Sequence, residues 1–362
     1  GGNLYNDQGY RYLETEQRYR GNINLRYTVE KLRGLQIGVN TNVLTAKGGL
    51  FLIWVDPDSA LYPAGGDLSH YKNFRVNVDP YLIFRTKKDA KHTLRSRFFR
   101  SVNLNTANQE STADVYYTEY QYQKQFKKEL TWTAGAVYNY NEVYADSLYG
   151  THFNANASVY TQLDKKWKRL TASVGIRAEY FKTDSIETKE TIYFLLDQSK
   201  PLAKQSKIKP VVRLGLNYRL LKTTYLRASA GQGFRFPSIA ERFIRTSASG
   251  LEIYPNDSLQ PESGWSTELG IKQLLKCGDW KGYVDVAGFW TEYKNMMEFT
   301  LGQYGDPFND PFFGIGFQSR NIGNTRIRGI DVSVVGQGKI GMVDMTVLMG
   351  YTYIDPRQTD FD

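Results

Sequence analysis

The chain has 362 residues and a formal net charge of +9, a length that fits two or three ordinary domains or one very large β structure. Aromatic residues make up 14% of it, and 27 tyrosines and 32 glycines suit many strands joined by polar turns. No stretch approaches the roughly 18 apolar residues of a membrane helix, so a helical membrane protein is excluded, whereas a membrane barrel of alternating strands is not.

The strands are predicted from a polar and apolar alternation with a period of two residues. In residues 18–30, Ile23 and Leu25 point to one side of the strand while Asn24 and Arg26 point to the other. The same pattern recurs along the chain and predicts about fourteen strands. We expect them at residues 18–30, 34–46, 73–86, 92–104, 114–126, 129–143, 151–163, 169–183, 207–219, 223–235, 263–275, 280–293, 325–337 and 341–354.

One of these strands contains a proline. Pro80 lies inside residues 73–86, and a proline cannot donate to a central β ladder. We therefore expect a β-bulge at this position.

The connections between the strands are expected to alternate strictly between short and long. Short turns are expected near Lys31, Lys87, Lys127, Lys165, Leu220, Cys277 and Gly338. Long loops are expected near Pro57, Asn108, Asp146, Thr191, Thr246 and Asp306. This asymmetry, with strands of about 8 to 12 residues, is typical of an up-and-down membrane barrel. A soluble β-sandwich, a propeller or a surface adhesin is the alternative.

The stretch 231–272 is predicted to run as a strand, an ordered excursion and a second strand. Its middle contains Pro237, which discourages continuation of the strand. Ser238 and Glu241 have the spacing of a capping box, which predicts a short helix there.

The charged and thiol residues exclude several kinds of site. Basic residues scatter along the chain instead of gathering on one element, which argues against a nucleic acid partner. The single cysteine, Cys277, allows no internal disulfide and fits no metal-ligand spacing. With three histidines and no Ser-His-Asp arrangement, an enzyme is not expected.

Several motifs resemble the TonB-dependent outer-membrane receptors. The central stretch carries FRFPS at residues 234–238, NDSLQPE at 256–262 and STELGIK at 266–272. Two later segments are similar to the family's next strands, DVAGFWTEYKNMMEF at 285–299 and NIGNTRIRGIDV at 321–332. The resemblance covers nearly the whole chain as barrel, and its specific motifs lie in residues 231–332.

This resemblance implies an all-β, antiparallel up-and-down transmembrane β-barrel, part of a barrel of about 22 strands whose lumen holds an N-terminal plug. Residues 1–362 would form one barrel segment with long extracellular loops and short periplasmic turns, and the plug and last strands would lie outside the chain. Residues 223–235 would run outward, residues 236–262 would form an extracellular loop, and residues 263–275 would return.

The implied function is active uptake, across the bacterial outer membrane, of a scarce nutrient such as siderophore-iron. The partners would be the TonB-ExbB-ExbD complex acting through the plug, outer-membrane lipid, and a small-molecule ligand such as a ferric siderophore. Neither catalysis nor a bound cofactor is expected. A passive porin-like barrel or a structural adhesin is the alternative function.

The candidate ligand-facing residues lie on the polar face of the strands and in the loops. Arginines on that face could bind an anionic ligand, or they could pair with carboxylates of the plug, which is the interpretation we favour. Glu262 could pair with Arg235 or Arg242, and His70, in an expected outer loop, could bind a metal complex or simply be solvated. The candidates are Arg213, Arg227, Arg235, Arg242, Glu262 and His70.

Haem is disfavoured as the ligand. Haem receptors of the family are expected to place a histidine between the motifs that correspond to FRFP and NDSL. This sequence has no histidine between them.

Overall fold

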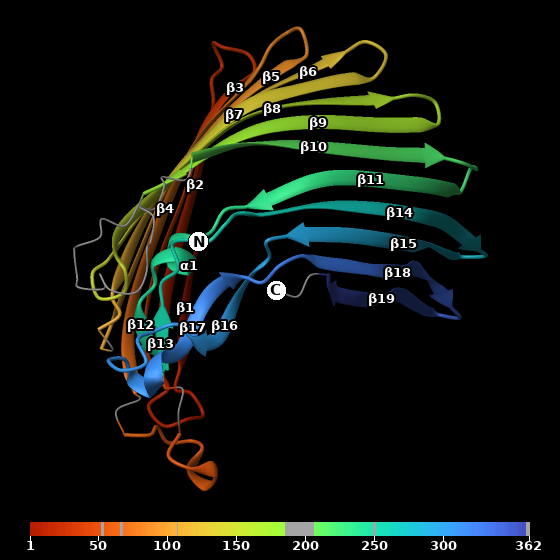
Figure 1. Ribbon diagram of the computed structural model, residues 1–362. Helices are drawn as coiled ribbons and strands as arrows, with labels where there is room; N and C mark the ends of the chain where they lie inside the picture. Colours follow the sequence, from red (N-terminus) through yellow and green to blue (C-terminus); the bar gives the residue numbers. More distant parts are fainter. Residues whose placement is uncertain (52–53, 66–67, 107, 185–205, 249–250, 360–362) are drawn as a thin grey trace.

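The computed structural model describes residues 1–51, 54–65, 68–106, 108–184, 206–248 and 251–359. Its main body is one 15-stranded antiparallel sheet, which curves into an open trough (Figure 1). Neighbouring strands follow the order of the chain. They are β1 (Gly2–Asp7), β2 (Glu16–Thr28), β3 (Leu35–Leu50), β4 (Ser69–Arg85), β5 (Ala90–Asn105), β6 (Ser111–Phe126), β7 (Leu130–Ala145), β8 (Gly150–Lys166), β9 (Leu170–Thr183), β10 (Ser206–Arg219), β11 (Thr224–Arg235), β14 (Glu262–Cys277), β15 (Trp280–Lys294), β18 (Thr325–Ile340) and β19 (Val343–Gln358).

Every predicted strand is confirmed, since each overlaps one of the strands from β2 to β19 of this sheet. β1 was not predicted, because its sequence GNLYND is short and lacks a clear alternation. The strands are also longer than expected, reaching 17 residues in β4 and β8. Pairing of the backbone therefore continues beyond the length that a bilayer crossing needs.

The predicted strict alternation of short and long connections is wrong in two places. Only residues 106–110 separate β5 from β6, and only residues 146–149 separate β7 from β8. In the second connection the N–H groups of Leu148 and Tyr149 both donate to the Ala145 carbonyl at 2.9 Å. These loops are short because the flanking strands extend into them. The long loop expected near Thr191 lies outside the described residues.

The bulge predicted at Pro80 is also wrong. Val78 pairs with Phe98, and three residues later Tyr81 pairs with Arg95, so both strands advance equally and no residue is inserted. On its other side Pro80 is in register with Val39 of β3. The proline is accommodated by a local gap in the β4–β5 ladder without any change of register.

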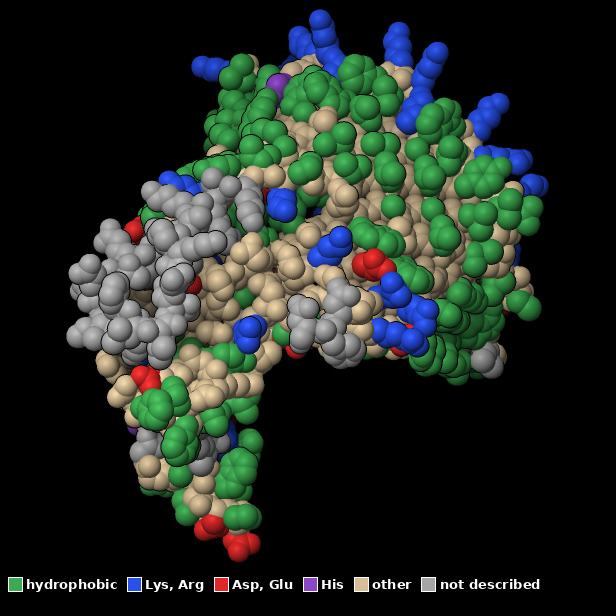
Figure 2. Space-filling model, viewed as in Figure 1, with side chains coloured by type: hydrophobic (Ala, Val, Ile, Leu, Met, Phe, Trp, Pro, Cys, Tyr) green, Lys and Arg blue, Asp and Glu red, His purple; other side chains and the backbone are tan. Residues whose placement is uncertain are grey.

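The two faces of the sheet differ in chemistry, as the alternation predicted. Apolar side chains such as Val159, Leu216 and Leu269 are 50–70% exposed on one face. The opposite face carries arginines such as Arg97, Arg177 and Arg213. Figure 2 shows apolar side chains spread over the visible wall, with Lys and Arg side chains projecting from its upper and right rim. Among the described residues no helix is long and apolar enough to cross a membrane.

Two of the long loops combine into a second sheet of four strands that lies at the loop end of the trough (Figure 1). One loop supplies the short helix α1 (Ile239–Phe243) as well as β12 (Thr246–Ala248) and β13 (Leu251–Tyr254). The other supplies β16 (Met297–Gln303) and β17 (Ile315–Asn321). The order is β12-β13-β17-β16, and β13 and β17 run parallel. The sequence predicts the short helix at Ser238 but none of these four strands.

The exposed apolar face predicts a depth-dependent response to a buried charge. Leu269 lies near the middle of β14 and is 70% exposed, whereas Leu275 lies near its end. Leu269→Arg is expected to lower the free energy of unfolding in lipid vesicles by about 2–4 kcal/mol, and Leu275→Arg by less than about 1 kcal/mol. Denaturant titration of the membrane-inserted protein measures both. Equal costs for the two substitutions would contradict a lipid-facing wall.

Candidate functional site

Three of the predicted site residues meet at one cavity on the polar face of the sheet. Arg213 of β10, Arg235 of β11 and Glu262 of β14 line a space of about 620 Å³. The strand register brings them together, since Arg213 pairs with Gly231 and Arg235 pairs with Glu262. Serines and glycines of β11 and β14 also line the cavity, so much of its floor is backbone.

Arg235 is the centre of an ion-pair cluster at the rim of this cavity. Its Nε donates to Glu262 at 2.8 Å, and its Nη1 donates to both carboxylate oxygens of Glu241 at 2.8 Å. Of the two partners predicted for Glu262, Arg235 is therefore the correct one. The other oxygen of Glu262 accepts from the Met297 backbone N–H at 2.6 Å. This cluster joins the end of β11, the helix α1 and the start of β16.

The predicted capping box is confirmed. The Glu241 N–H donates to the Ser238 hydroxyl at 3.2 Å, and the Ser238 N–H donates to the Glu241 carboxylate at 2.8 Å. Burial alone would raise the pKa of Glu241, but the hydrogen bonds from Ser238 and Arg235 hold that pKa below its ordinary value of 4.5. Glu241 is thus held as a carboxylate that fixes both the helix and Arg235.

Aromatic stacking holds the α1 segment against the polar face of the neighbouring strands. Phe236 stacks on Phe181 of β9 with ring centroids 4.0 Å apart, and Phe243 stacks on His152 of β8 at 3.9 Å. The His152 Nδ1 lies 3.0 Å from the Asp184 carboxylate. The segment therefore leans back from β11 across β10 and β9 to β8, and we call it the strap (residues 236–245).

His152 was not singled out by sequence reasoning. The absence of a histidine between the FRFP and NDSL motifs is true of the sequence, yet the fold brings His152 into contact with Phe243, which lies between them. The sequence did contain one indication of its position. His152 alternates with Asn154 and Asn156 along β8 and therefore lies on the same polar face. With its ring stacked and its Nδ1 paired, His152 anchors the strap.

Arg242, predicted to face a ligand, is instead buried in the strap with a relative exposure of 3%. Its Nη2 donates to the Asp257 carbonyl at 2.9 Å, while its Nε and Nη1 have no hydrogen-bond partner among the described residues. Burial lowers the pKa of Arg242, and the carboxylates of Asp257 and Asp184 oppose that shift. The position is therefore electrostatically costly for the folded strap.

Arg227 lies deeper on the same wall and is already neutralised. Its Nε donates to Glu268 at 2.7 Å, and it also pairs with Asp285, which accepts a second ion pair from Lys272 at 3.2 Å. For Arg227 and Arg235 the carboxylates thus come from this chain, so the favoured interpretation that such arginines need plug carboxylates is wrong for these two.

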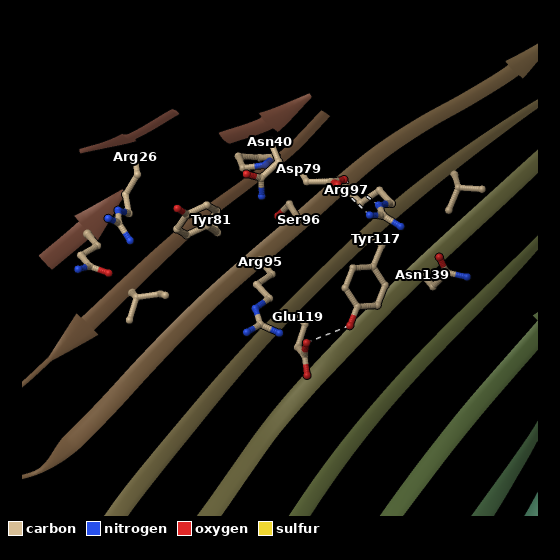
Figure 3. A pocket seen from close by; sticks show the side chains of 14 residues that line it. Arg26, Asn40, Asp79, Tyr81, Arg95, Ser96, Arg97, Tyr117, Glu119 and Asn139 are labelled. Carbon is tan, nitrogen blue, oxygen red and sulfur yellow. Dashed lines mark hydrogen bonds and ion pairs between the residues drawn. The ribbon is translucent and has the colours of Figure 1, made fainter. Parts of the chain in front are cut away.

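The remaining arginines of the polar face differ: Arg97 has a carboxylate partner, whereas Arg26, Arg95 and Arg213 have none among the described residues. In the cavity of about 760 Å³ drawn in Figure 3, Arg97 makes a bidentate ion pair with Asp79 at 2.7 and 2.8 Å. Arg26 and Arg95 line the same cavity. Within the described residues neither they nor Arg213 has a carboxylate within ion-pair distance.

His70 is separate from this cluster. It is exposed at the start of β4, where its N–H donates to the Thr106 hydroxyl at 3.0 Å. It lines a cavity of about 610 Å³ that contains none of the other predicted site residues. No group of three or more metal-ligating side chains occurs in the part of the chain that the structure describes.

The low pKa of Glu241 predicts that the strap loosens in acid. A carboxylate whose pKa is lower when folded stabilises the fold fully above its unfolded value of 4.5 and ceases to do so as the pH falls through the folded value. Amide hydrogen exchange of residues 239–245, corrected for intrinsic rates, should therefore accelerate below about pH 4.5. Glu241→Gln should speed exchange at pH 7 and flatten this profile, and an unchanged profile in that variant would contradict the assignment.

The stacked ring of Phe243 predicts a large contribution to strap docking. Phe243→Ala removes a buried ring and should lower the free energy of strap opening by about 3 kcal/mol. Protease cleavage after Arg245 in the membrane-inserted protein measures the opening. The matched control is Phe308→Ala, because that ring is 94% exposed. Equal protection of the two variants would show that the stack does not hold the strap.

Comparison with known proteins agrees with this geometry. The family model described as TonB dependent receptor-like, beta-barrel matches residues 1–362. Hemoglobin-haptoglobin utilization protein B of Neisseria meningitidis serogroup A is 30% identical over 98 residues, which are 27% of this chain and 12% of that protein.

Solved structures share the fold at low identity. The Serratia marcescens hemophore receptor HasR, in complex with its hemophore HasA and heme, superposes with a TM-score of 0.70 at 14% identity, covering 94% of this chain and 54% of that one. The siderophore receptor PirA from Pseudomonas aeruginosa gives 0.68 at 13% identity, covering 99% and 66%. The chain thus spans less than two thirds of each. Because the family model matches the whole chain, the protein belongs to the TonB-dependent receptor β-barrels, which lie in the bacterial outer membrane and are transport receptors rather than enzymes.

Proposed function

We propose that the chain forms the barrel wall of a receptor that actively imports a scarce nutrient, siderophore-iron or another bulky ligand, with energy from TonB. The observation that carries this proposal is the strap. It is anchored to the polar face of the wall by the Arg235 ion pairs and by two aromatic stacks. Membership of the receptor family supports it.

The strap disfavours the alternative of a passive porin-like barrel or an adhesin. A passive pore conducts best through a wide water-filled lumen. Here the strap lies over the polar face of β8 to β11 and is fixed by contacts with His152, Phe181 and Arg235. Such a segment suits a receptor that binds a bulky ligand at its mouth and admits it in a controlled step.

The ligand-facing role is proposed first for Arg213. Unlike Arg227 and Arg235, it has no ion pair within the described residues, and it lines both the cavity of 620 Å³ and a neighbouring one of 410 Å³. A free guanidinium in a polar cavity binds carboxylate or catecholate oxygens well. We propose an anionic iron chelate as the ligand, and the siderophore receptor named among the solved structures of similar fold supports this choice.

The proposed partners follow from the two faces of the wall. The apolar face contacts outer-membrane lipid, and the polar face encloses the plug domain of the whole receptor. TonB-ExbB-ExbD would act on that plug, and residues 1–362 would form one segment of the surrounding barrel. Arg26 and Arg95 are the proposed contacts of the plug, because both lack carboxylate partners in the described wall.

Uptake in cells with and without TonB tests the proposal. Cells that produce the intact receptor should accumulate radioactive iron from one member of a panel of ferric siderophores, and deletion of TonB should abolish this. Accumulation that persists without TonB would support the passive barrel instead.

The Arg213 role has its own test in the same cells. Arg213→Gln should lower siderophore affinity by about tenfold, since an ion pair to a buried ligand contributes roughly 1.5–3 kcal/mol. Lys222→Gln removes the same charge from a short turn and should have no effect. Equal affinities of the two variants would remove Arg213 from the ligand site and leave TonB dependence untouched.

A further inference from the structure

The two edge strands of the four-stranded sheet differ in length and in the contacts that cover them. β12 is three residues long, and the Gln109 side chain caps it by donating to the Thr246 hydroxyl at 2.9 Å and the Ser247 carbonyl at 3.4 Å. β16 is seven residues long and ends the sheet at the other side. Within the described residues no strand pairs with its outer edge.

The hydrogen bonds at both ends of β16 show which backbone groups point outward. The Ile322 N–H donates to the Met296 carbonyl at 2.8 Å, and the Tyr304 N–H donates to the Gly314 carbonyl at 2.9 Å. Because bonded pairs alternate along an antiparallel ladder, the even-numbered residues of β16 bond to β17. The N–H and C=O groups of Phe299 and Leu301 therefore face away from β17.

This outer edge lacks most of the features that usually protect an edge strand. Such strands are commonly shortened, bulged, or marked with charged side chains, lysine above all, or with proline. β16 has the sequence MEFTLGQ, its register with β17 is continuous over all seven pairs, and Phe299 and Leu301 are 52% and 58% exposed. Its one charged residue, Glu298, is exposed and has no ion pair among the described residues.

The edge is also rigidly supported from behind. Asn321 donates from its side chain to the carbonyls of Gln260 and Asn295 at 3.0 and 2.7 Å. The Asn256 side chain donates to the Ser319 carbonyl at 2.9 Å. At the first residue of β16 the outward-facing Met297 N–H donates to Glu262, so the edge without a partner among the described residues begins at Phe299. A strand that is already ordered loses little conformational entropy when a second strand pairs with it.

We propose that the outer edge of β16 is a docking site for an extended segment of a protein ligand, which adds a strand to the four-stranded sheet. Unpaired backbone groups in a row are satisfied by another extended backbone and not by a lipid chain or a compact chelate. Phe299 and Leu301 require apolar residues at alternate positions of the incoming segment, and Glu298 favours a basic residue next to the one that faces Phe299. This docking step is independent of TonB-driven transport.

The test measures binding of a defined peptide to the purified intact receptor in detergent. The probe is an end-blocked, fluorophore-labelled peptide of sequence Val-Thr-Val-Lys-Val-Thr-Val. Leu301→Pro removes one outward N–H and leaves the neighbouring bonds to β17 in place, and it should weaken binding by about tenfold. Phe299→Glu keeps the backbone and should weaken binding comparably by replacing an apolar contact with a charge. Phe308→Ala, away from the edge, should bind like the unsubstituted receptor.

Two results would overturn the proposal. One is equal binding by all four proteins, or no binding by any, while heat-shift electrophoresis shows that each is folded. The other is dimerisation of the unsubstituted receptor that Leu301→Pro abolishes, because the edge would then pair with a second copy of the chain. Loss of iron uptake is not a readout here, so failure of docking and failure of transport remain distinguishable.

Discussion

The requirement that every backbone N–H and C=O group be hydrogen-bonded in lipid controls the rest of this structure. The sheet meets it with strands of 12 or more residues each from β2 onward, paired in chain order, although β10 and β11 pair over only seven residues. Once each strand bonds to two neighbours, its side chains can only alternate between the lipid face and the enclosed face. The apolar character of the lipid face and the polar character of the enclosed face both follow from that alternation.

The same alternation decides which charges meet on the enclosed face. An arginine can reach only side chains on its own face of adjacent strands, and the register sets which those are. Arg227 is in register with Gly270. Because glycine has no side chain, the guanidinium passes over it and reaches both Glu268 and, one strand further, Asp285. Around Arg213 the register places Gly231 and Gly175 opposite it, and no carboxylate of the described residues lies within ion-pair distance.

Sequence periodicity predicted the strands well because a two-residue repeat is local and is imposed by the bilayer. The capping box at Ser238 and Glu241 was predictable for the same reason, since its partners are three residues apart. The ends of β5 to β8 were not, because above the membrane the alternation no longer reflects a lipid face. Turn residues such as Asn108 and Asp146 therefore suggested longer loops than the structure has.

The contacts that define the site were less accessible because they join distant residues. The parallel pairing of β13 with β17 joins two loops separated by an entire hairpin, and no local pattern specifies it. The stack of Phe243 on His152 depends on how far the strap leans toward β8. Arg242 looked like a ligand-facing charge because charged residues are rarely buried, and only the packing of the strap shows that it is enclosed.

Glu262 links the parts of the receptor mouth that the proposals treat separately. One carboxylate oxygen holds Arg235, which in turn holds Glu241 of the strap, and the other accepts the Met297 N–H at the start of β16. A carboxylate bound on both sides has a fixed orientation, so the strap can be displaced only by breaking one bond of this chain, from Glu241 through Arg235 and Glu262 to Met297, or by carrying β16 with it. The short path from the strap to the four-stranded sheet runs through two side chains, Arg235 at the end of β11 and Glu262 at the start of β14. That makes the inner cavity and the outer edge strand parts of one rigid assembly rather than two independent loops.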